Sequence, residues 1–108
     1  MNKTELRILW SNYDGGCFES VSINNETEIR DEGIRKWFVI TGEQNYDSGY
    51  NSRRRWIAPL DDVLRAFGMQ NYAELADYFE GKYQENKRAL DDIKAEASSK
   101  GVKFEYTS

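Results

Sequence analysis

The chain has 108 residues, of which 39% are hydrophobic and 31% charged, and its formal net charge is −4. This length and composition predict one folded domain over residues 1–108 rather than a disordered chain. It contains no histidine and a single cysteine, which excludes histidine-based nucleophilic catalysis and argues against a zinc site. We therefore expect no catalytic residue, no metal and no cofactor.

No apolar run approaches the roughly 20 residues needed to span a bilayer, and the N-terminal segment lacks a signal-peptide cleavage pattern. A single cysteine, Cys17, cannot form a disulfide within the chain. These features predict a cytoplasmic protein that has no membrane partner.

The first two predicted strands form a hairpin. Residues 4–13 alternate apolar and polar side chains, Asp14-Gly15 is a two-residue turn signal, and residues 16–23 alternate again. This turn would pair Ile8 with Val21, so that the apolar faces of the two strands match.

The next segments predict two further strands separated by irregular connections. Residues 24–33 are polar and acidic, and residues 34–41 have apolar side chains on both faces, which is typical of a central strand. Gly42 begins a loop of about ten residues, and residues 53–58 alternate as a fourth strand.

The chain then becomes helical. A first helix begins at Pro59 and ends at Gly68, and a second, longer helix begins at Asn71, is weakened at Gly81 and ends at Gly101. The apolar stripe of the second helix is Tyr72, Leu75, Ala76, Phe79, Tyr83, Leu90, Ile93 and Ala97. Its spacing predicts burial against the sheet, with self-association through the part after Gly81 as the alternative.

Residues 102–106 alternate as a final strand. The order β-β-β-β-α-α-β predicts an α+β domain. Its sheet would be mostly antiparallel, with four to five strands, and the two C-terminal helices would pack on one face.

Three groups of residues are candidates for contact with a partner. The acidic candidates on the helices are Asp61, Asp62, Glu74, Asp77 and Glu80, the loop candidates are Tyr46, Asp47 and Tyr50, and the anion-contact candidates are Arg53, Arg54 and Arg55. Spaced carboxylates can meet a basic surface or imitate duplex phosphates, and Tyr, Ser, Asn and Gly suit an adaptable binding loop. Strand alternation divides the arginines between two faces, so we expect at least one to meet a carboxylate of the same chain.

These features favour a small, acidic, non-catalytic protein-binding module. It would regulate or inhibit a partner with a basic surface, such as a nucleic-acid-binding protein, and a phage or mobile-element counter-defence protein would have this character. One alternative is a nucleic-acid-binding accessory protein that uses Arg53 to Arg55 with Trp56 and the loop tyrosines. Another is a small enzyme with carboxylate and tyrosine chemistry. We expect a protein partner rather than direct nucleic-acid binding, and a monomer or weak homodimer.

Overall fold

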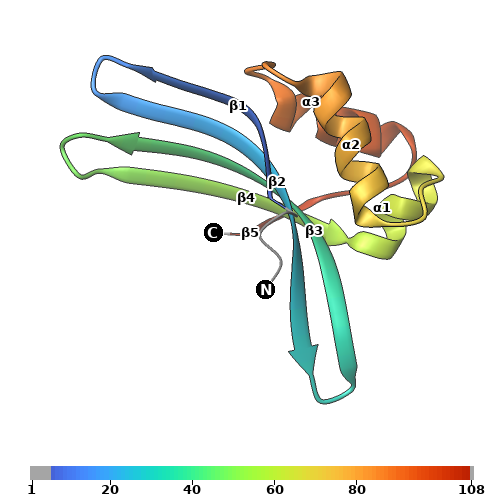
Figure 1. Ribbon diagram of the computed structural model, residues 1–108. Helices are drawn as coiled ribbons and strands as arrows, with labels where there is room; N and C mark the ends of the chain where they lie inside the picture. The colour runs from blue at the N-terminus through green and yellow to red at the C-terminus, as the bar shows by residue number, and fades with distance from the viewer. Residues whose placement is uncertain (1–5, 108) are drawn as a thin grey trace.

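A computed structural model describes residues 6–107 and shows the predicted α+β architecture (Figure 1). Its elements are β1 (Arg7–Asp14), β2 (Cys17–Arg30), β3 (Gly33–Tyr46), β4 (Asn51–Pro59), α1 (Leu60–Phe67), α2 (Tyr72–Tyr83), α3 (Ala89–Ser99) and β5 (Glu105–Thr107). The predicted first strand also included residues 4 and 5, which lie outside the described residues. The final strand is shorter than predicted, because β5 begins only at Glu105. Val102 and Phe104 precede it and are buried.

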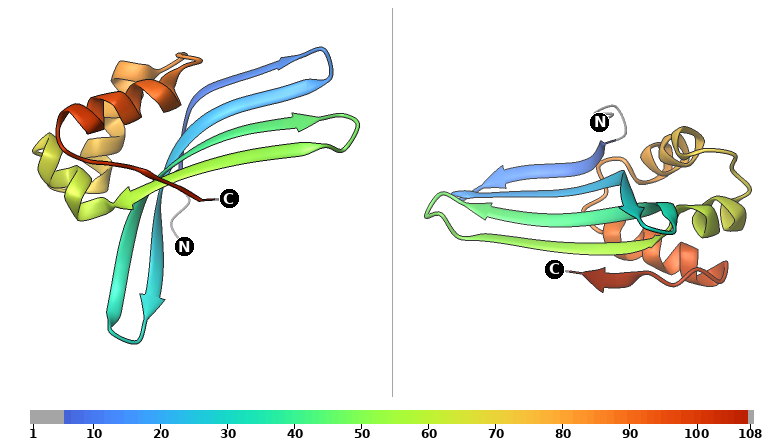
Figure 2. Two further views of the ribbon diagram at one scale, coloured as in Figure 1. Left: turned by 180° about the vertical axis from the view of Figure 1, so that it is seen from behind. Right: turned by 90° about the horizontal axis from the view of Figure 1, so that it is seen from below.

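The five strands form one antiparallel sheet in the order β1-β2-β3-β4-β5. All three helices pack on one face, here called the helix face, and the opposite face is called the open face (Figures 1 and 2). The sheet bends away from the helices and ends in two projecting arms. One arm contains β1 to β4, and the other contains only β2 and β3 over residues 27–36.

The predicted β1–β2 register is wrong. Asp14 pairs with Cys17, so the turn is Gly15-Gly16 rather than Asp14-Gly15. Both glycines have positive φ, at 60° and 81°, which a two-residue turn of this kind requires and which glycine adopts without the steric cost that a side chain adds.

A β-bulge in β1 shifts the register a second time. The shifted turn already places Val21 opposite Trp10 instead of Ile8, and the bulge between Ile8 and Trp10 then pairs Ile8 with Ser22. The bulge turns Leu9 into the core, where it is 1% exposed, and leaves Ile8 55% exposed.

The strands also extend through segments that were predicted to be irregular. β2 continues to Arg30 through the acidic connection, and β3 continues to Tyr46 through most of the predicted loop. The physical reason is the ladder itself, because β2 and β3 pair without interruption from Cys17–Tyr46 to Arg30–Gly33. Continuous backbone hydrogen bonding outweighs the weak strand preference of Asn and Glu.

The hydrophobic core lies between the helices and the middle of the sheet. Its largest members include Phe38 on β3, Phe79 on α2 and Ile93 on α3, all fully buried. Gly42 permits the close approach of α3 to β3, since a Cβ there would lie 3.2 Å from Leu90 Cδ1. No helix among the described residues is long and apolar enough to cross a membrane.

The predicted second helix is two helices, so residues 6–107 contain three helices where two were expected. The break lies between Tyr83 and Ala89, not at Gly81. Glu85 has φ 61° and donates its backbone N–H to Leu9 O at 2.6 Å. This reversal folds α3 back over the sheet, and every residue of the predicted apolar stripe is buried in the core. The stripe is therefore not available for self-association in the folded chain.

Candidate functional site: the tyrosine tip

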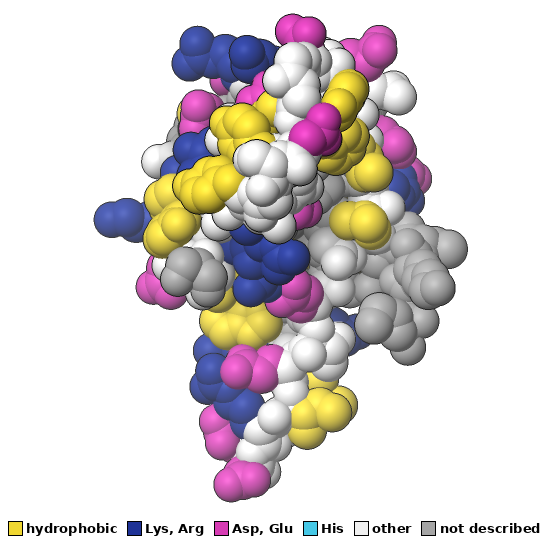
Figure 3. Space-filling view, turned by 90° about the vertical axis from the view of Figure 1, so that its left-hand side faces the viewer, with side chains coloured by type: hydrophobic (Ala, Val, Ile, Leu, Met, Phe, Trp, Pro, Cys, Tyr) yellow, Lys and Arg dark blue, Asp and Glu magenta, His cyan; other side chains and the backbone are white. Residues whose placement is uncertain are grey.

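Exposed aromatic side chains gather at the end of the four-stranded arm, where the β1–β2 and β3–β4 turns lie side by side. We call this site the tyrosine tip; it consists of Tyr13, Phe18, Tyr46, Asp47 and Tyr50. The four aromatic residues are 60%, 38%, 38% and 64% exposed, respectively. Figure 3 looks toward this arm and shows hydrophobic side chains with acidic groups beside them in its upper half.

Hydrogen bonds join the two turns. Tyr13 donates its hydroxyl to Asp47 Oδ2 at 2.7 Å, and the Asp47 backbone N–H donates to Gly16 O at 2.8 Å. Within the second turn, Tyr46 N–H donates to Tyr50 O at 2.9 Å, and the two tyrosine rings lie 5.6 Å apart. These contacts hold the Tyr13 hydroxyl and the Tyr46 and Tyr50 rings in place before any partner binds.

The hydrogen bonds of the tip raise the pKa values of two of its tyrosines. The hydrogen bond to Asp47 raises the pKa of Tyr13 above its ordinary value, and the side-chain hydrogen bond with Cys17 raises the pKa of Tyr46. Both hydroxyls are therefore protonated near neutral pH, and Tyr13 stays a donor to the Asp47 carboxylate.

The sequence prediction identified the second turn of the tip and missed the first. Tyr13 and Phe18 were not among the predicted contact residues. They pair across β1 and β2 on the open face, whereas Tyr46 pairs with Cys17 and lies on the helix face, so the exposed rings of the tip lie on both sides of the sheet end. A signal was present, because Asn-Tyr-Asp-x-Gly occurs twice, at residues 12–16 and 45–49. The structure brings the two copies together at one end of the sheet.

The predicted acidic residues of α1 and α2 are mostly engaged within the chain. Arg7 Nη1 lies 2.7 Å from Asp77 Oδ1 and 2.9 Å from Glu80 Oε1. At the ends of the helices, Arg65 lies 3.3 Å from Asp62, and the Glu74 carboxylate accepts the backbone N–H of Gln70 at 2.8 Å.

Asp61 is exposed and has no such contact among the described residues. Asp77 and Glu80, by contrast, link α2 to β1 through Arg7, and their reversal to lysine would place new cations beside that arginine. The acidic surface keeps a net negative charge but presents fewer unpaired carboxylates than the sequence indicated.

The arginine triplet is divided as predicted. Arg55 forms an ion pair with Glu26, and Arg53 Nε lies 3.9 Å from Glu43 Oε2. Arg54 pairs with Gly42 in the β3–β4 ladder and lies on the opposite face from its two neighbours. The three side chains therefore do not form one continuous cationic patch.

Trp56, which the nucleic-acid alternative would use for base stacking, is already in contact with other groups. Lys94 Nζ lies 3.1 Å from the centre of its ring, and the Tyr106 ring lies 5.1 Å away in an edge-on arrangement. The face of the indole is thus occupied by side chains of α3 and β5.

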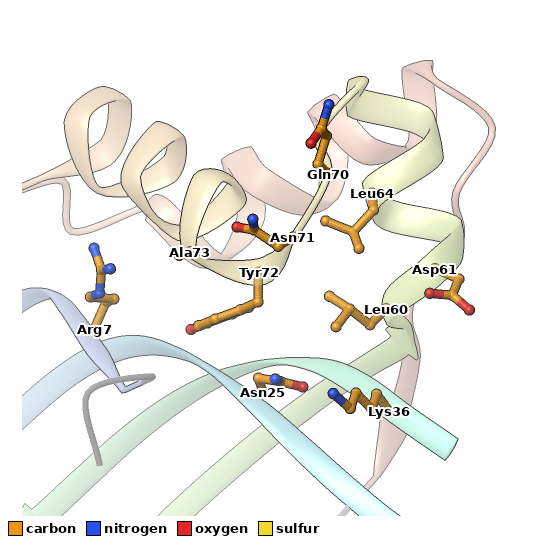
Figure 4. A pocket seen from close by; sticks show the side chains of 10 residues that line it. All are labelled: Arg7, Asn25, Lys36, Leu60, Asp61, Leu64, Gln70, Asn71, Tyr72 and Ala73. Carbon is orange, nitrogen blue, oxygen red and sulfur yellow. The ribbon is translucent and has the colours of Figure 1, made fainter. Parts of the chain in front are cut away.

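A cleft of about 500 Å³ lies between the sheet and the N-terminal ends of α1 and α2 (Figure 4). Arg7 and Lys36 lie at its sides, and Asn25 forms part of its floor, where Oδ1 is buried and has no hydrogen-bond partner among the described residues. Asp61 is the one carboxylate in the described lining, and Tyr72 is its one tyrosine. Residues 6–107 also contain no group of three or more metal-ligating side chains placed to hold an ion.

No protein-family model, curated protein or solved structure matches the chain.

Proposed function

We propose that this chain is a small, acidic, non-catalytic binding module that engages the basic surface of a protein partner through the tyrosine tip, as a regulator or inhibitor. The observation that carries the proposal is the tip itself. Four large aromatic side chains are exposed at or beside two turns that hydrogen bonds hold together. Tyrosine is enriched among the residues that dominate binding energy at protein interfaces, and an ordered site loses less conformational entropy on binding.

The charge of the tip and of the whole chain supports a basic partner. Asp14 and Asp47 flank the exposed rings, and the chain has 19 acidic against 15 basic residues. An arginine of the partner could stack on the Tyr46 or Tyr50 ring and reach one of these carboxylates. The acidic residues of α1 and α2 would add long-range attraction that increases the association rate.

The experiment begins with capture of the partner from a cognate host lysate and its identification by mass spectrometry. The double variant Tyr46→Ala/Tyr50→Ala should then bind the purified partner at least about tenfold more weakly, because each hot-spot truncation costs about 1–2 kcal/mol or more. Both side chains are exposed, so the unfolding temperature should change little.

The matched control is Ile29→Ala/Ile34→Ala. These two residues pair across the end of the two-stranded arm and are 81% and 69% exposed. This control removes exposed apolar surface from the other end of the sheet and should leave affinity unchanged. Equal binding by the tyrosine variant and the wild-type chain would reject the tip as the binding site.

The contribution of the acidic surface can be tested separately with Asp61→Lys, because Asp61 has no ion-pair partner among the described residues. Its reversal should slow association at low salt and weaken the salt dependence. The loss of stability should stay within about 1 kcal/mol, which is the effect of a charge in the first turn of α1. An association rate that is unaffected at low salt would remove this surface from the proposal.

A further inference from the structure

The outer edge of β1 is open over its second half. β1 is the first strand in the sheet order, and the view from below in Figure 2 shows no element beside it toward the turn. Asp14 and Cys17 flank the two-residue turn, so hydrogen-bonded and non-hydrogen-bonded pairs alternate from that point along β1 and β2. By this alternation, the backbone N–H and C=O groups of Ser11 and Tyr13 point outward from the sheet.

The Leu9–Glu85 contact marks where the open edge ends. Leu9 O also points outward, and it accepts the Glu85 backbone N–H at 2.6 Å. From Trp10 to Asp14, by contrast, the strand has no proline, lysine or bulge, which are common devices that protect a sheet edge from pairing. Five residues of strand span about 17 Å, which is enough for a short added strand.

A hollow lies beside this edge. Its volume is about 330 Å³, and it is lined by Ile8 to Ser11 on β1 and by Gln84 and Glu85 between α2 and α3. Glu85 is the charged residue of this described lining; Lys87 and Arg88 follow in the same connection but do not line it. The Glu85 side chain is exposed and has no ion pair among the described residues.

A second carboxylate lies at the other end of the edge. Asp14 shares a face with Trp10, because both pair with residues on the helix face of β2. An added strand would therefore pass Glu85 and Asp14 with alternate side chains on that face. Its other side chains would lie on the open face beside Ser11 and Tyr13.

We propose that the β1 edge binds an extended, basic segment of the partner protein by strand addition. The segment has basic residues at alternate positions facing Glu85 and Asp14, and apolar or β-branched residues between them facing Tyr13. Backbone hydrogen bonds to Ser11 and Tyr13 supply binding that is independent of side-chain identity, and the two carboxylates select positive charge. The inference rests on the proposed function for the basic character of the partner, and it adds a second contact next to the tyrosine tip.

The probe is the synthetic peptide acetyl-Lys-Val-Lys-Val-Lys-Val-Lys-amide, with the Glu-Val peptide of the same length as the charge control. Amide hydrogen exchange of the ¹⁵N-labelled full chain is followed by NMR. At saturating Lys-Val peptide, exchange at Ser11 and Tyr13 should slow by at least about tenfold, because a new hydrogen bond must open before exchange occurs. The Glu-Val peptide should produce no such protection.

Two variants locate the contact. Ser11→Pro removes one outward N–H at an edge position that tolerates proline, and Ser11→Thr keeps it. The proline variant should bind the Lys-Val peptide at least about fivefold more weakly than the threonine variant. If the proline variant does not fold, two measurements still decide the question. They are amide exchange in the wild-type chain and binding of the Lys-Val peptide by Glu85→Gln, which should also be weaker.

Several results would overturn the inference. They are the absence of protection at Ser11 and Tyr13 up to millimolar Lys-Val peptide, equal protection by the Glu-Val peptide, and protection in the free protein that grows with its own concentration. The last result would assign the edge to a second copy of the chain.

The two proposals can fail separately. A captured partner that depends on Tyr46 and Tyr50 but binds Ser11→Pro normally would reject the edge alone. If the Lys-Val peptide protects Ser11 and Tyr13, but the captured partner binds Tyr46→Ala/Tyr50→Ala as tightly as the wild-type chain, the tip alone would be rejected.

Discussion

Glu96 on α3 should be one of the few charged residues on which the stability of the fold depends. Its carboxylate accepts hydrogen bonds from the Tyr78 and Tyr83 hydroxyls of α2, and Lys82 Nζ lies 3.2 Å away. The Glu96 side chain is 15% exposed, and Tyr83 is 7% exposed. The cluster therefore joins two helices that meet at a sharp reversal, and part of it is shielded from water.

Substitution of Glu96 by alanine removes two charge-assisted hydrogen bonds and leaves the Tyr83 hydroxyl buried without its acceptor. An unsatisfied buried donor costs about 1–3 kcal/mol, while water can replace the acceptor of the half-buried Tyr78 at lower cost. Alanine favours the helix over glutamate by only a few tenths of a kcal/mol. We expect Glu96→Ala to lower the free energy of unfolding by about 2–4 kcal/mol, and Glu96→Gln by about 1–2 kcal/mol, because the amide keeps a neutral acceptor.

Urea unfolding followed by circular dichroism measures these changes. Glu105→Ala, at an exposed position on β5, is the control and should change stability by less than about 0.5 kcal/mol. A double-mutant cycle of Glu96→Gln with Tyr83→Phe should give a coupling energy of at least about 0.5 kcal/mol. A loss below about 0.5 kcal/mol for Glu96→Ala, or a coupling near zero, would show that the cluster does not stabilise the α2–α3 pairing.

Three further predictions follow from particular contacts. Burial opposes ionisation of Glu96, but the hydrogen bonds from Tyr78, Tyr83 and Lys82 outweigh it and hold the pKa of Glu96 below the ordinary 4.5. Burial and the hydrogen bond to Glu96 raise the pKa of Tyr83 above the ordinary 10.0. Unfolding free energy measured against pH should therefore fall as pH drops below about 4.5 and fall again as pH rises past about 10, and a flat profile in either range would contradict these shifts. Asn71→Ala should destabilise the chain by about 1 kcal/mol in urea unfolding, because the Asn71 side chain accepts the Glu74 N–H at the start of α2. Asn71→Ser should retain most of the stability, and an equal loss for both variants would argue against the cap. Oligonucleotides should bind with a dissociation constant of about 10⁻⁴ M or weaker at physiological salt in fluorescence anisotropy, since the arginine triplet is divided and partly paired. Micromolar binding that is lost in Arg53→Ala/Arg55→Ala would restore the nucleic-acid alternative.

Local patterns in the sequence were sufficient to predict the fold class and most elements. Alternating apolar residues identified the strands, and glycine at the end of α1 and Asn71 at the start of α2 marked the helix boundaries that the structure shows. These signals are local because each depends on a few neighbouring residues and on the dihedral angles they adopt. The division of the arginine triplet between two faces follows from the same strand periodicity.

The tertiary structure decided the features that depend on residues far apart in the chain. No local pattern places Arg7 against Asp77 and Glu80, joins Tyr13 to Asp47, or turns the chain at Glu85 so that its N–H reaches Leu9. The β1–β2 register also depended on a bulge that buries Leu9 under the helices, where the energy of burial outweighs regular alternation. The sequence alone therefore determined the fold class and the place of most strands and helices, whereas long-range pairing decided how far β2 and β3 extend. The same pairing brings two distant turns together as the tyrosine tip, and the β1 edge is open because β1 is the first strand in the sheet order.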